Sequence, residues 1–299
     1  MHIIHTELKT IRDFIRFATS NFNKANLYYG HGTTNSWDEA FALILHTLYL
    51  PHNVSEEILS ANLTKSECEE LFTVIHKRIS KHLPVPYITH QAWFCGLPFY
   101  VDERVLIPRS PIAELIEKQF QPWVKVDNIH HILDLCTGSG CIAIACGLVF
   151  PEAKVDASDI AFEALEVAKI NIEEHHVEDQ VTLYQSDLFK ELPVKKYDII
   201  VSNPPYVSDE EMTELPNEYQ HEPAAALQAG EQGLDIIIEI LKQASQYLTS
   251  HGILIVEVGN SYHALCEQYP DIPFTWLEFE RSDAEVFLLT AEQLRKVVI

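Results

Sequence analysis

Hydrophobic side chains recur at helical spacing in the first part of the chain. This spacing predicts a helix over residues 8–18. A second helix is expected to begin with Ser36 as its N-cap, because Glu39 three residues later completes a capping-box pattern. Pro51 ends that helix, and the same periodicity predicts a third helix over residues 55–79.

A change of pattern marks the end of this helical region. Pro84 and Pro86 are expected to stop helical structure. Residues 91–107 are rich in aromatic and β-branched side chains on both sides of a Gly-Leu-Pro sequence, which predicts a β-hairpin, and Ser110 is a suitable N-cap for a following helix. The sequence therefore predicts a helical domain over residues 1–85, a linker with a hairpin over 86–110 and a larger domain over 111–299.

Strand and helix patterns alternate in the rest of the chain. Strands are predicted over residues 132–136, 155–158, 181–184, 197–202, 252–258, 274–278 and 286–290. Helices are predicted near residues 141–149, 162–175, 233–247 and 261–269. This alternation predicts an α/β fold with a doubly wound, mostly parallel seven-stranded sheet covered on both faces. The last two strands are close in sequence and are expected to form an antiparallel hairpin at one edge.

The composition is that of an ordinary globular protein, with 47% hydrophobic and 22% charged residues in a chain of 299. Residues 1–5, Met-His-Ile-Ile-His, lack a basic segment followed by an apolar core, so no signal peptide is predicted. No apolar run reaches the roughly 18–20 residues that a membrane-spanning helix needs. We therefore expect a cytoplasmic protein with no membrane partner.

Charge is distributed unevenly along the chain, whose formal net charge is −23. Residues 1–90 carry 8 Lys and Arg against 9 Asp and Glu, whereas residues 91–299 carry 13 against 35. An acidic surface repels phosphate backbones, so DNA binding is not expected. A basic protein would be attracted, although acidity that only maintains solubility is an equally good explanation.

The cysteines and histidines do not form a metal-binding pattern. The six cysteines are scattered, without a Cys-x-x-Cys pair. Among the fifteen histidines, two pairs at 130–131 and 175–176 are adjacent in sequence, so their side chains point in different directions. No metal is assigned.

A glycine loop follows the first strand of the larger domain. The strand end, Asp134-Leu135-Cys136, leads into Thr137-Gly138-Ser139-Gly140 and then a helix. In a doubly wound sheet such a loop lies at the carboxyl edge of the strands, where ligands bind, and glycine lets a ligand approach the backbone closely. Ala143 occupies the place of the third glycine of a dinucleotide fingerprint, so this loop alone does not identify the ligand.

Two acidic residues end the next two strands. Asp159 ends the second strand about twenty residues after the glycine loop, where a carboxylate accepts hydrogen bonds from ribose hydroxyls. Asp187 ends the third, where an acceptor can bind an adenine amino group. Either acid alone is also typical of a turn or a helix N-cap. Their order and their positions at strand ends favour a cofactor that contains a nucleoside.

The fourth strand, residues 197–202, runs directly into Asn203-Pro204-Pro205-Tyr206. Two prolines after a buried strand can simply form a stiff loop. The chemistry of planar nitrogens suggests more, because an amide nitrogen is a weak nucleophile that benefits from two acceptors holding its N–H bonds. The side-chain oxygen of Asn203 and the carbonyl of Pro204 are such acceptors, and the prolines restrict the direction of that carbonyl. Tyr206 offers a flat face to a planar group.

In this order the motifs resemble those of class I S-adenosylmethionine-dependent methyltransferases that act on planar nitrogens. The last loop occurs in adenine-specific DNA methyltransferases and in protein-glutamine methyltransferases. The helical first domain, Pro86-Tyr87-Ile88-Thr89 and Leu106-Ile107-Pro108-Arg109 resemble the second group. Stretches within residues 29–40, 92–105 and 215–219 are similar to the branch that methylates a glutamine of large-subunit ribosomal protein L-three.

This resemblance implies roles for individual residues. Asp134 and the loop Thr137-Gly138-Ser139-Gly140 belong to the cofactor site, with the loop beside the methionine part of S-adenosylmethionine, Asp159 at its ribose and Asp187 at its adenine. The segment from Asn203 to Tyr206 is expected to hold the glutamine amide, with Asn203 also beside the cofactor. Arg109 and Glu222 are assigned to the substrate side, and the helical domain to substrate recognition.

Three alternative functions are compatible with some of these motifs. A methyltransferase acting on peptide chain release factors needs the same site with a different docking surface. A DNA adenine methyltransferase is disfavoured by the acidic catalytic half, which has no basic target-recognition segment. A binding module without activity is disfavoured by the intact segment from Asn203 to Tyr206.

Overall fold

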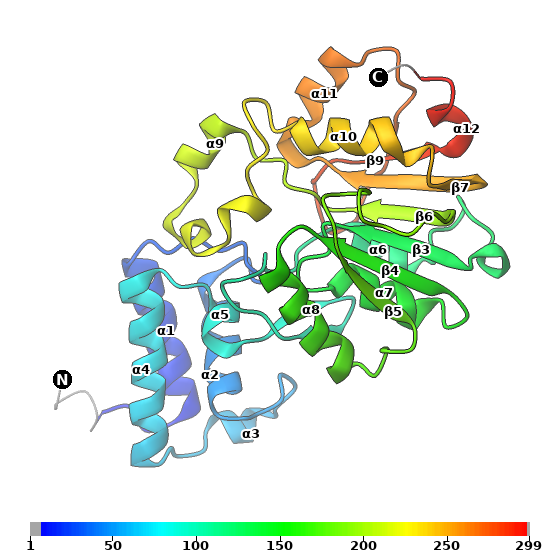
Figure 1. Cartoon of the computed structure of the whole chain (residues 1–299). Helices are drawn as coiled ribbons and strands as arrows, with labels where there is room; N and C mark the ends of the chain where they lie inside the picture. The colour runs from blue at the N-terminus through cyan, green and yellow to red at the C-terminus, as the bar shows by residue number, and fades with distance from the viewer. Residues whose placement is uncertain (1–6, 298–299) are drawn as a thin grey trace. The chain divides into compact units, whose positions relative to one another are not determined.

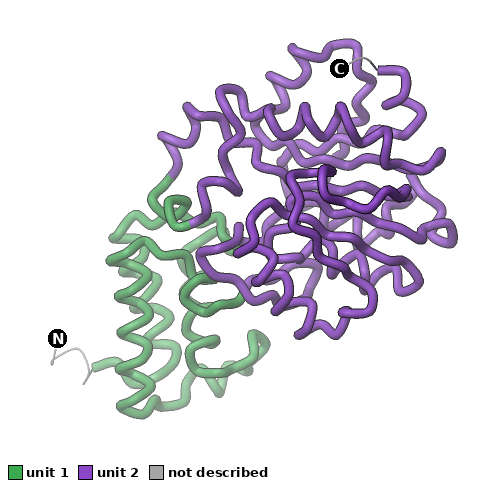
Figure 2. The backbone as a smooth tube through the Cα atoms, viewed as in Figure 1, with its two compact units in different colours: residues 1–91, 216–221 green, residues 92–215, 222–299 purple. Residues whose placement is uncertain are grey.

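The computed structural model describes residues 7–297, which form two compact units (Figure 2). One unit is formed by residues 1–91 and 216–221, and the other by residues 92–215 and 222–299. Residues 1–5, for which no signal peptide is predicted, lie outside the described residues. The short segment 216–221 therefore belongs to the helical unit although it is more than a hundred residues away in sequence.

Three helices, α1, α2 and α4, form the helical unit around one hydrophobic core (Figure 1). Apolar residues at helical spacing place Phe14, Leu43 and Leu71 in this core, where all three are fully buried. Two shorter helices, α3 and α5, complete the unit. The helices span Ile11–Lys24 (α1), Ser36–Thr47 (α2), Glu56–Leu59 (α3), Lys65–Lys81 (α4) and Val85–Thr89 (α5).

The start of α2 differs from the sequence prediction. Asn35, not Ser36, is the N-cap, and its side chain accepts hydrogen bonds from the main-chain N–H groups of Trp37 and Asp38. Glu39 does not complete a capping box, because its carboxylate accepts from Arg78 instead. A buried ion pair thus replaces the local contact that the sequence pattern suggested.

The predicted third helix is interrupted, and a further helix follows it. Helices α3 and α4 are separate because Thr64 and Glu67 form a capping box that starts α4 anew. The prediction that Pro84 and Pro86 stop helical structure is also wrong, since α5 begins at Val85. Both prolines fall at the start of this helix, where the N–H groups have no intrahelical partner and a proline is tolerated.

The predicted hairpin is present but short. Strand β1, Ala92–Phe94, pairs antiparallel with β2, Leu97–Phe99, through a turn at Cys95 and Gly96. Residues 100–111 continue without helix or strand. Helix α6, Ile112–Glu117, follows, and its N-cap is Pro111 and not Ser110 as predicted. The hydroxyl of Ser110 nevertheless accepts from the N–H of Ile112 at 3.2 Å.

The larger unit is built on a seven-stranded sheet within the described residues, with strand order β5-β4-β3-β6-β7-β9-β8. The first five strands in this order are parallel, and β9 runs antiparallel between β7 and β8. This confirms the predicted fold class, although β8 has only two residues. The strands span His131–Leu135 (β3), Lys154–Asp159 (β4), Val181–Gln185 (β5), Tyr197–Ser202 (β6), Leu248–Glu257 (β7), Thr275–Trp276 (β8) and Val286–Thr290 (β9).

Helices cover both faces of this sheet (Figure 1). Side chains alternate along each strand, so that Ile132 of β3 packs in one core with α6, α7 and α8, while Leu133 packs in the other with α10, α11 and α12. The helices of this unit, beyond α6, are Cys141–Val149 (α7), Phe162–Glu174 (α8), Asp209–Glu214 (α9), Asp235–Ala244 (α10), Tyr262–Gln268 (α11) and Ala291–Leu294 (α12).

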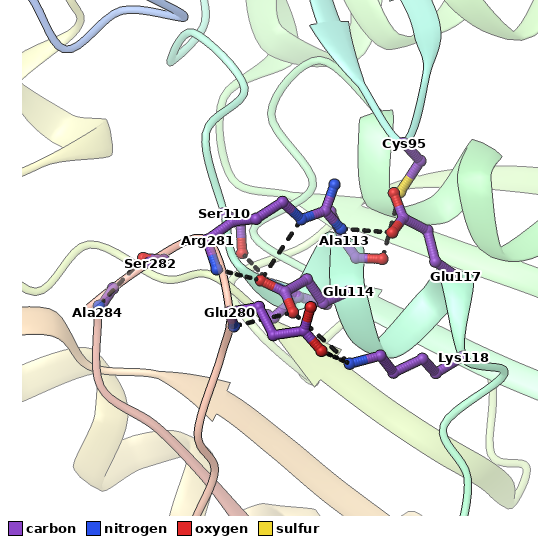
Figure 3. Close-up of polar contacts among 11 residues, drawn as sticks. Cys95, Ser110, Ala113, Glu114, Glu117, Lys118, Glu280, Arg281, Ser282 and Ala284 are labelled. Carbon is purple, nitrogen blue, oxygen red and sulfur yellow. Dashed lines mark hydrogen bonds and ion pairs between the residues drawn. The ribbon is translucent and has the colours of Figure 1, made fainter. Parts of the chain in front are cut away.

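Helix α6 is held by contacts with two segments that are distant in sequence (Figure 3). The carboxylate of Glu114 accepts from the main-chain N–H groups of Glu280 and Arg281 at 3.1 and 2.9 Å. On the other side, the thiol of Cys95 in the hairpin turn donates to the carbonyl of Ala113. These contacts restrain α6 and, with it, the segment that precedes it. In residues 7–297 no helix is both long and apolar enough to cross a membrane.

Candidate active site

Five of the predicted site residues, Pro205 and the four named next, border one pocket at the carboxyl edge of the sheet. Gly138, Asp159, Asp187 and Asn203 follow or end β3, β4, β5 and β6, and parallel strands bring such positions to one edge. The pocket lies within the larger unit. Its other lining residues are Arg104, Val105, Leu106, Cys136, Ser158, Ile160, Ala161, Ala164, Ser186, Leu188, Pro223, Ala225, Ala226, Gln228 and Ile236.

The glycine loop is shaped by the buried carboxylate of Asp134. One of its oxygens, Oδ2, accepts from the hydroxyl of Thr137 at 2.6 Å and from the N–H of Ala143 at 3.1 Å. These bonds tie the loop to the start of α7. Gly138 adopts a left-handed conformation with φ of 54°, which favours glycine, and it is the member of the loop that lines the pocket.

Asp134, Thr137, Ser139 and Gly140 are not among the residues that line the pocket. The carboxylate of Asp134, like the side chain of Thr137, is part of the buried support of the loop. The sequence prediction grouped supporting and lining residues together because both occur in one short motif. Their direct contact with a cofactor stays a prediction.

Asp159 and Asp187 border the pocket in different environments. The carboxylate of Asp159 accepts from the N–H groups of Gly138 and Ala161, both at 2.9 Å, so it also fixes the glycine loop. The side chain of Asp187 is 46% exposed and pairs with Lys190. The predicted ribose acceptor is therefore well ordered by its surroundings, and the predicted adenine acceptor is more accessible to solvent.

Two buried carboxyl groups lie at or behind the wall of this pocket. Burial raises the pKa of Asp134 to about 7, against an ordinary value of 3.8, and also raises the pKa of Asp159. The Oδ1 atom of Asp134 is buried and has no hydrogen-bond partner among the described residues. A ligand with a positive group would stabilise the charged form of these acids. These carboxyl groups therefore fit a cofactor that carries a positive charge.

The predicted catalytic segment directly follows β6. Asn203 and Pro205 line the pocket, Pro204 is buried, and Tyr206 is half-buried. The next residue, Val207, holds the segment in place through two main-chain hydrogen bonds. Its N–H donates to the carbonyl of Leu227, and its carbonyl accepts from the N–H of Ala229.

The ring of Tyr206 is fixed by Glu257 and Gly259. The phenol donates to Oε1 of Glu257 at 2.9 Å. Gly259 has φ of 46°, and a Cβ atom at this position would lie 2.5 Å from the tyrosine ring, so the close approach requires glycine. The other oxygen of Glu257 accepts from the hydroxyl of Ser110 at 2.5 Å.

Glu257 supports the predicted catalytic segment through Tyr206, and sequence reasoning did not single it out. It is 3% exposed, and burial raises its pKa. A signal was present, because Glu257 ends the apolar strand β7 in the same way that Asp159 ends β4.

The two residues assigned to the substrate side bind each other. Arg109 donates to Glu222 through both terminal nitrogens, at 2.6 and 2.8 Å, in a bidentate pair. Glu222 also accepts from the main-chain N–H of Ile107 at 2.9 Å. The side chain of Glu222 is fully buried and that of Arg109 is 22% exposed. A role in contacting substrate stays a prediction, whereas a role in joining the two segments is evident from these bonds.

The fold is that of a methyltransferase, and the family of methyltransferase small domains matches residues 118–230. Two curated relatives are similar over nearly the whole chain. The ribosomal protein uL3 glutamine methyltransferase of Neisseria meningitidis is 51% identical, over 96% of this chain and 95% of the relative. That of Neisseria gonorrhoeae is 50% identical, over 96% of both chains. The chain belongs to the family of ribosomal protein uL3 glutamine methyltransferases, and it is an enzyme of that class.

Proposed function

We propose that this enzyme transfers a methyl group from S-adenosylmethionine to the side-chain amide nitrogen of a glutamine in ribosomal protein uL3. This is the large-subunit protein called L-three in the first subsection. The observation that carries the proposal is the position of Asn203, which borders the same pocket as Gly138 and Asp159. An amide acceptor is thereby placed at the wall of a pocket suited to a cationic nucleoside cofactor.

The residues around the pocket fit S-adenosylmethionine, which supplies an electrophilic methyl group when bound. Asp134 provides negative charge behind the glycine loop for the positive groups of the cofactor. Each oxygen of Asp159 accepts one N–H in the structure, and a carboxylate oxygen can accept two, so capacity remains for ribose hydroxyls. Asp187, at the more exposed end, is the proposed acceptor for the adenine amino group.

The catalytic segment would act on the substrate by orientation and not by strong base chemistry. The side-chain oxygen of Asn203 and the carbonyl of Pro204 are proposed to accept the two N–H bonds of the glutamine amide. This would hold the nitrogen lone pair toward the methyl group and stabilise the positive charge that develops on nitrogen. Tyr206, whose ring is held by Glu257, would pack against the planar amide.

The choice of uL3 as substrate is supported by the relatives and by charge. Both relatives are named for this ribosomal protein, and residues 91–299 carry 13 basic against 35 acidic residues. RNA-binding proteins are generally basic, so attraction would speed the encounter. The helical unit is the proposed recognition domain, and the cytoplasmic location expected from the sequence belongs to the same proposal.

The test is a methylation assay with radiolabelled S-adenosylmethionine and three separate acceptors, namely purified uL3, a peptide chain release factor and DNA. Label is expected in uL3 alone, and mass spectrometry should place the added methyl group on a glutamine side chain. Label in the release factor or in DNA, with uL3 unlabelled, would contradict the assignment of substrate. Binding of S-adenosylmethionine without transfer to any acceptor would favour a module that has lost its activity.

A further inference from the structure

Residues 208–226 form a long loop, called the excursion below, that follows the catalytic segment and leads back to the pocket. Its two ends meet where Val207 and Gln228 form an isolated parallel bridge. At this closure the N–H of Val207 donates to the carbonyl of Leu227 at 2.8 Å, and the N–H of Ala229 donates to the carbonyl of Val207 at 2.9 Å. Because Val207 directly follows Tyr206, any strain on the excursion reaches the catalytic segment at this closure.

The tip of the excursion, Pro216–His221, belongs to the helical unit. Glu218 anchors it there. Its carboxylate accepts from the guanidinium of Arg78 at 2.9 Å and from the main-chain N–H of Tyr28 at 3.0 Å. The side chains of Arg78 and Glu218 are 1% and 2% exposed. An ion pair this well buried is costly to break, because the partner left behind remains a desolvated charge.

The returning part of the excursion is anchored in the larger unit by Glu222. This residue, four positions after Glu218, forms the bidentate pair with Arg109 and accepts from the N–H of Ile107. The residues that follow it, Pro223, Ala225 and Ala226, line the cofactor pocket. The excursion thus has one buried glutamate–arginine anchor in each unit, and the second anchor adjoins the pocket wall.

A second glutamate, Glu39, also pairs with Arg78 and serves as a control for Glu218. Glu39 accepts from Nε of Arg78 at 2.6 Å and is as deeply buried as Glu218, but it lies on α2 and not on the excursion. Burial raises the pKa of Glu39. For Glu218 burial acts in the same direction, but the hydrogen bonds from Arg78 and from the N–H of Tyr28 outweigh it, so its pKa is lowered. Both glutamates thus pair with the same guanidinium, but only Glu218 also accepts a main-chain N–H from Tyr28.

We propose that Glu218 and Glu222 are positioning residues for methyl transfer, because they hold the excursion so that the catalytic segment and one wall of the cofactor pocket depend on the helical unit. On this view the helical unit contributes to the rate of the chemical step as well as to docking of the substrate. Neither glutamate needs to touch the substrate or the cofactor.

The experiment compares Glu218→Gln with Glu39→Gln in the full-length enzyme. Both changes remove one carboxylate from Arg78 and preserve side-chain shape, but only the first weakens the anchor of the excursion. With uL3 saturating, kcat of Glu218→Gln is expected to fall about tenfold, a change of ~1.4 kcal/mol, with KM changed far less. The dissociation constant of S-adenosylmethionine should stay close to that of the wild type. Glu39→Gln should keep kcat within about twofold.

Hydrogen exchange measured by mass spectrometry gives a second readout without substrate or cofactor. In Glu218→Gln the amides of Val207 and Ala229, which close the excursion, should exchange about tenfold faster than in the wild type. In Glu39→Gln those amides should be unchanged, even if α2 exchanges faster. The kcat measurement rests on the proposed function, whereas the hydrogen-exchange measurement does not. A failure of the positioning proposal can therefore be told from a failure of the proposed function.

Several outcomes would overturn the proposal. Equal effects of the two substitutions on kcat and on exchange would mean that the Arg78 cluster only stabilises the helical unit. An effect of Glu218→Gln confined to KM would reduce the role of the anchor to docking. Unchanged exchange at Val207 and Ala229 would exclude transmission through the excursion, whatever the kinetics show.

Discussion

Buried carboxylates occur in both units of the chain, and only some of those in the larger unit have a charged partner. In the helical unit the guanidinium of Arg78 lies between the carboxylates of Glu39 and Glu218, at 2.6 and 2.9 Å. In the larger unit Asp134 and Glu257 are as deeply buried, but the hydrogen bonds they accept come from hydroxyl and main-chain N–H groups. Burial accordingly raises the pKa of both carboxyl groups.

The two kinds of buried carboxylate have different consequences, one for how segments are held together and the other for ligand binding. A buried carboxylate with an arginine partner is compensated within the protein, so the pair specifies which segments lie together. A buried carboxylate with only neutral donors is costly in its charged form and gains stability from a cation that comes from outside. The helical unit, whose buried glutamates are paired with Arg78, is the one proposed to recognise a protein. The larger unit, which has the proposed cofactor pocket, holds both kinds of carboxylate: Glu222 is paired with Arg109, whereas Asp134 and Glu257 accept only from neutral groups.

The largest expected effect comes from removing the compensating cation of the helical unit. Arg78→Met leaves Glu39 and Glu218 buried without their partner, which should lower the free energy of unfolding by about 3–5 kcal/mol at neutral pH. Denaturant unfolding followed by circular dichroism measures this loss. The loss should shrink at pH 5, because the stranded carboxyl groups can then take up protons.

A triple variant controls for this prediction. Arg78→Met combined with Glu39→Gln and Glu218→Gln removes the charges together, so most of the lost stability should return. If Arg78→Met alone costs less than about 1 kcal/mol, the cluster is hydrated in solution and does not act as a buried ion pair.

The next largest effect is expected from Asn203, an uncharged residue of the predicted catalytic segment. Asn203→Ala removes a neutral acceptor proposed to orient the substrate amide, so turnover should fall by about 10²–10³, or ~3–4 kcal/mol. Calorimetric titration should show nearly unchanged affinity for S-adenosylmethionine. A variant with a near-normal rate would contradict the proposed role of Asn203.

The pH dependence of stability tests the uncompensated carboxylate directly. Because burial raises the folded-state pKa of Asp134 from 3.8 to about 7, the folded protein holds a proton that the unfolded chain has released between these values. The free energy of unfolding should therefore fall by about 2 kcal/mol through this group between pH 5 and pH 7. Asp134→Asn should lack this component. The measurement is the difference between wild type and variant at both pH values, and parallel curves would contradict the assignment.

The smallest effect links the same group to the cofactor. A cationic ligand favours ionised Asp134, so the affinity for S-adenosylmethionine should rise by up to about tenfold between pH 6 and pH 8. Calorimetry in buffers of different ionisation enthalpy should detect protons released on binding at pH 6. An affinity that is independent of pH, with no proton release, would mean that Asp134 acts only as a support of the glycine loop.

The sequence was sufficient for features that depend on local patterns. The strands from β3 to β7 follow from short apolar runs between helices, and the glycine loop and the segment from Asn203 to Tyr206 follow from motifs at their ends. Parallel pairing then brings Gly138, Asp159, Asp187 and Asn203 to one edge without further information. Such features were predictable because side chains only a few residues apart determine them.

One error in the helical unit came from a contact between helices, and another from a local capping signal that was not used. The pattern of Ser36 and Glu39 is a good local capping signal, but Glu39 gains more by pairing with Arg78 in the interior. Helices α3 and α4 could have been separated at Thr64 and Glu67, since the capping box there is a local pattern. Hydrophobic periodicity alone did not reveal the break.

The tertiary structure alone decided which distant residues meet. Glu218 is 140 positions from Arg78, and Glu222 is 113 positions from Arg109. Any of the many acidic residues of this chain could pair with an arginine as far as composition and spacing are concerned. The partner is selected only when the closed excursion takes its tip to the helical unit and its return to the pocket, because burial then excludes water and makes the specific pairing necessary.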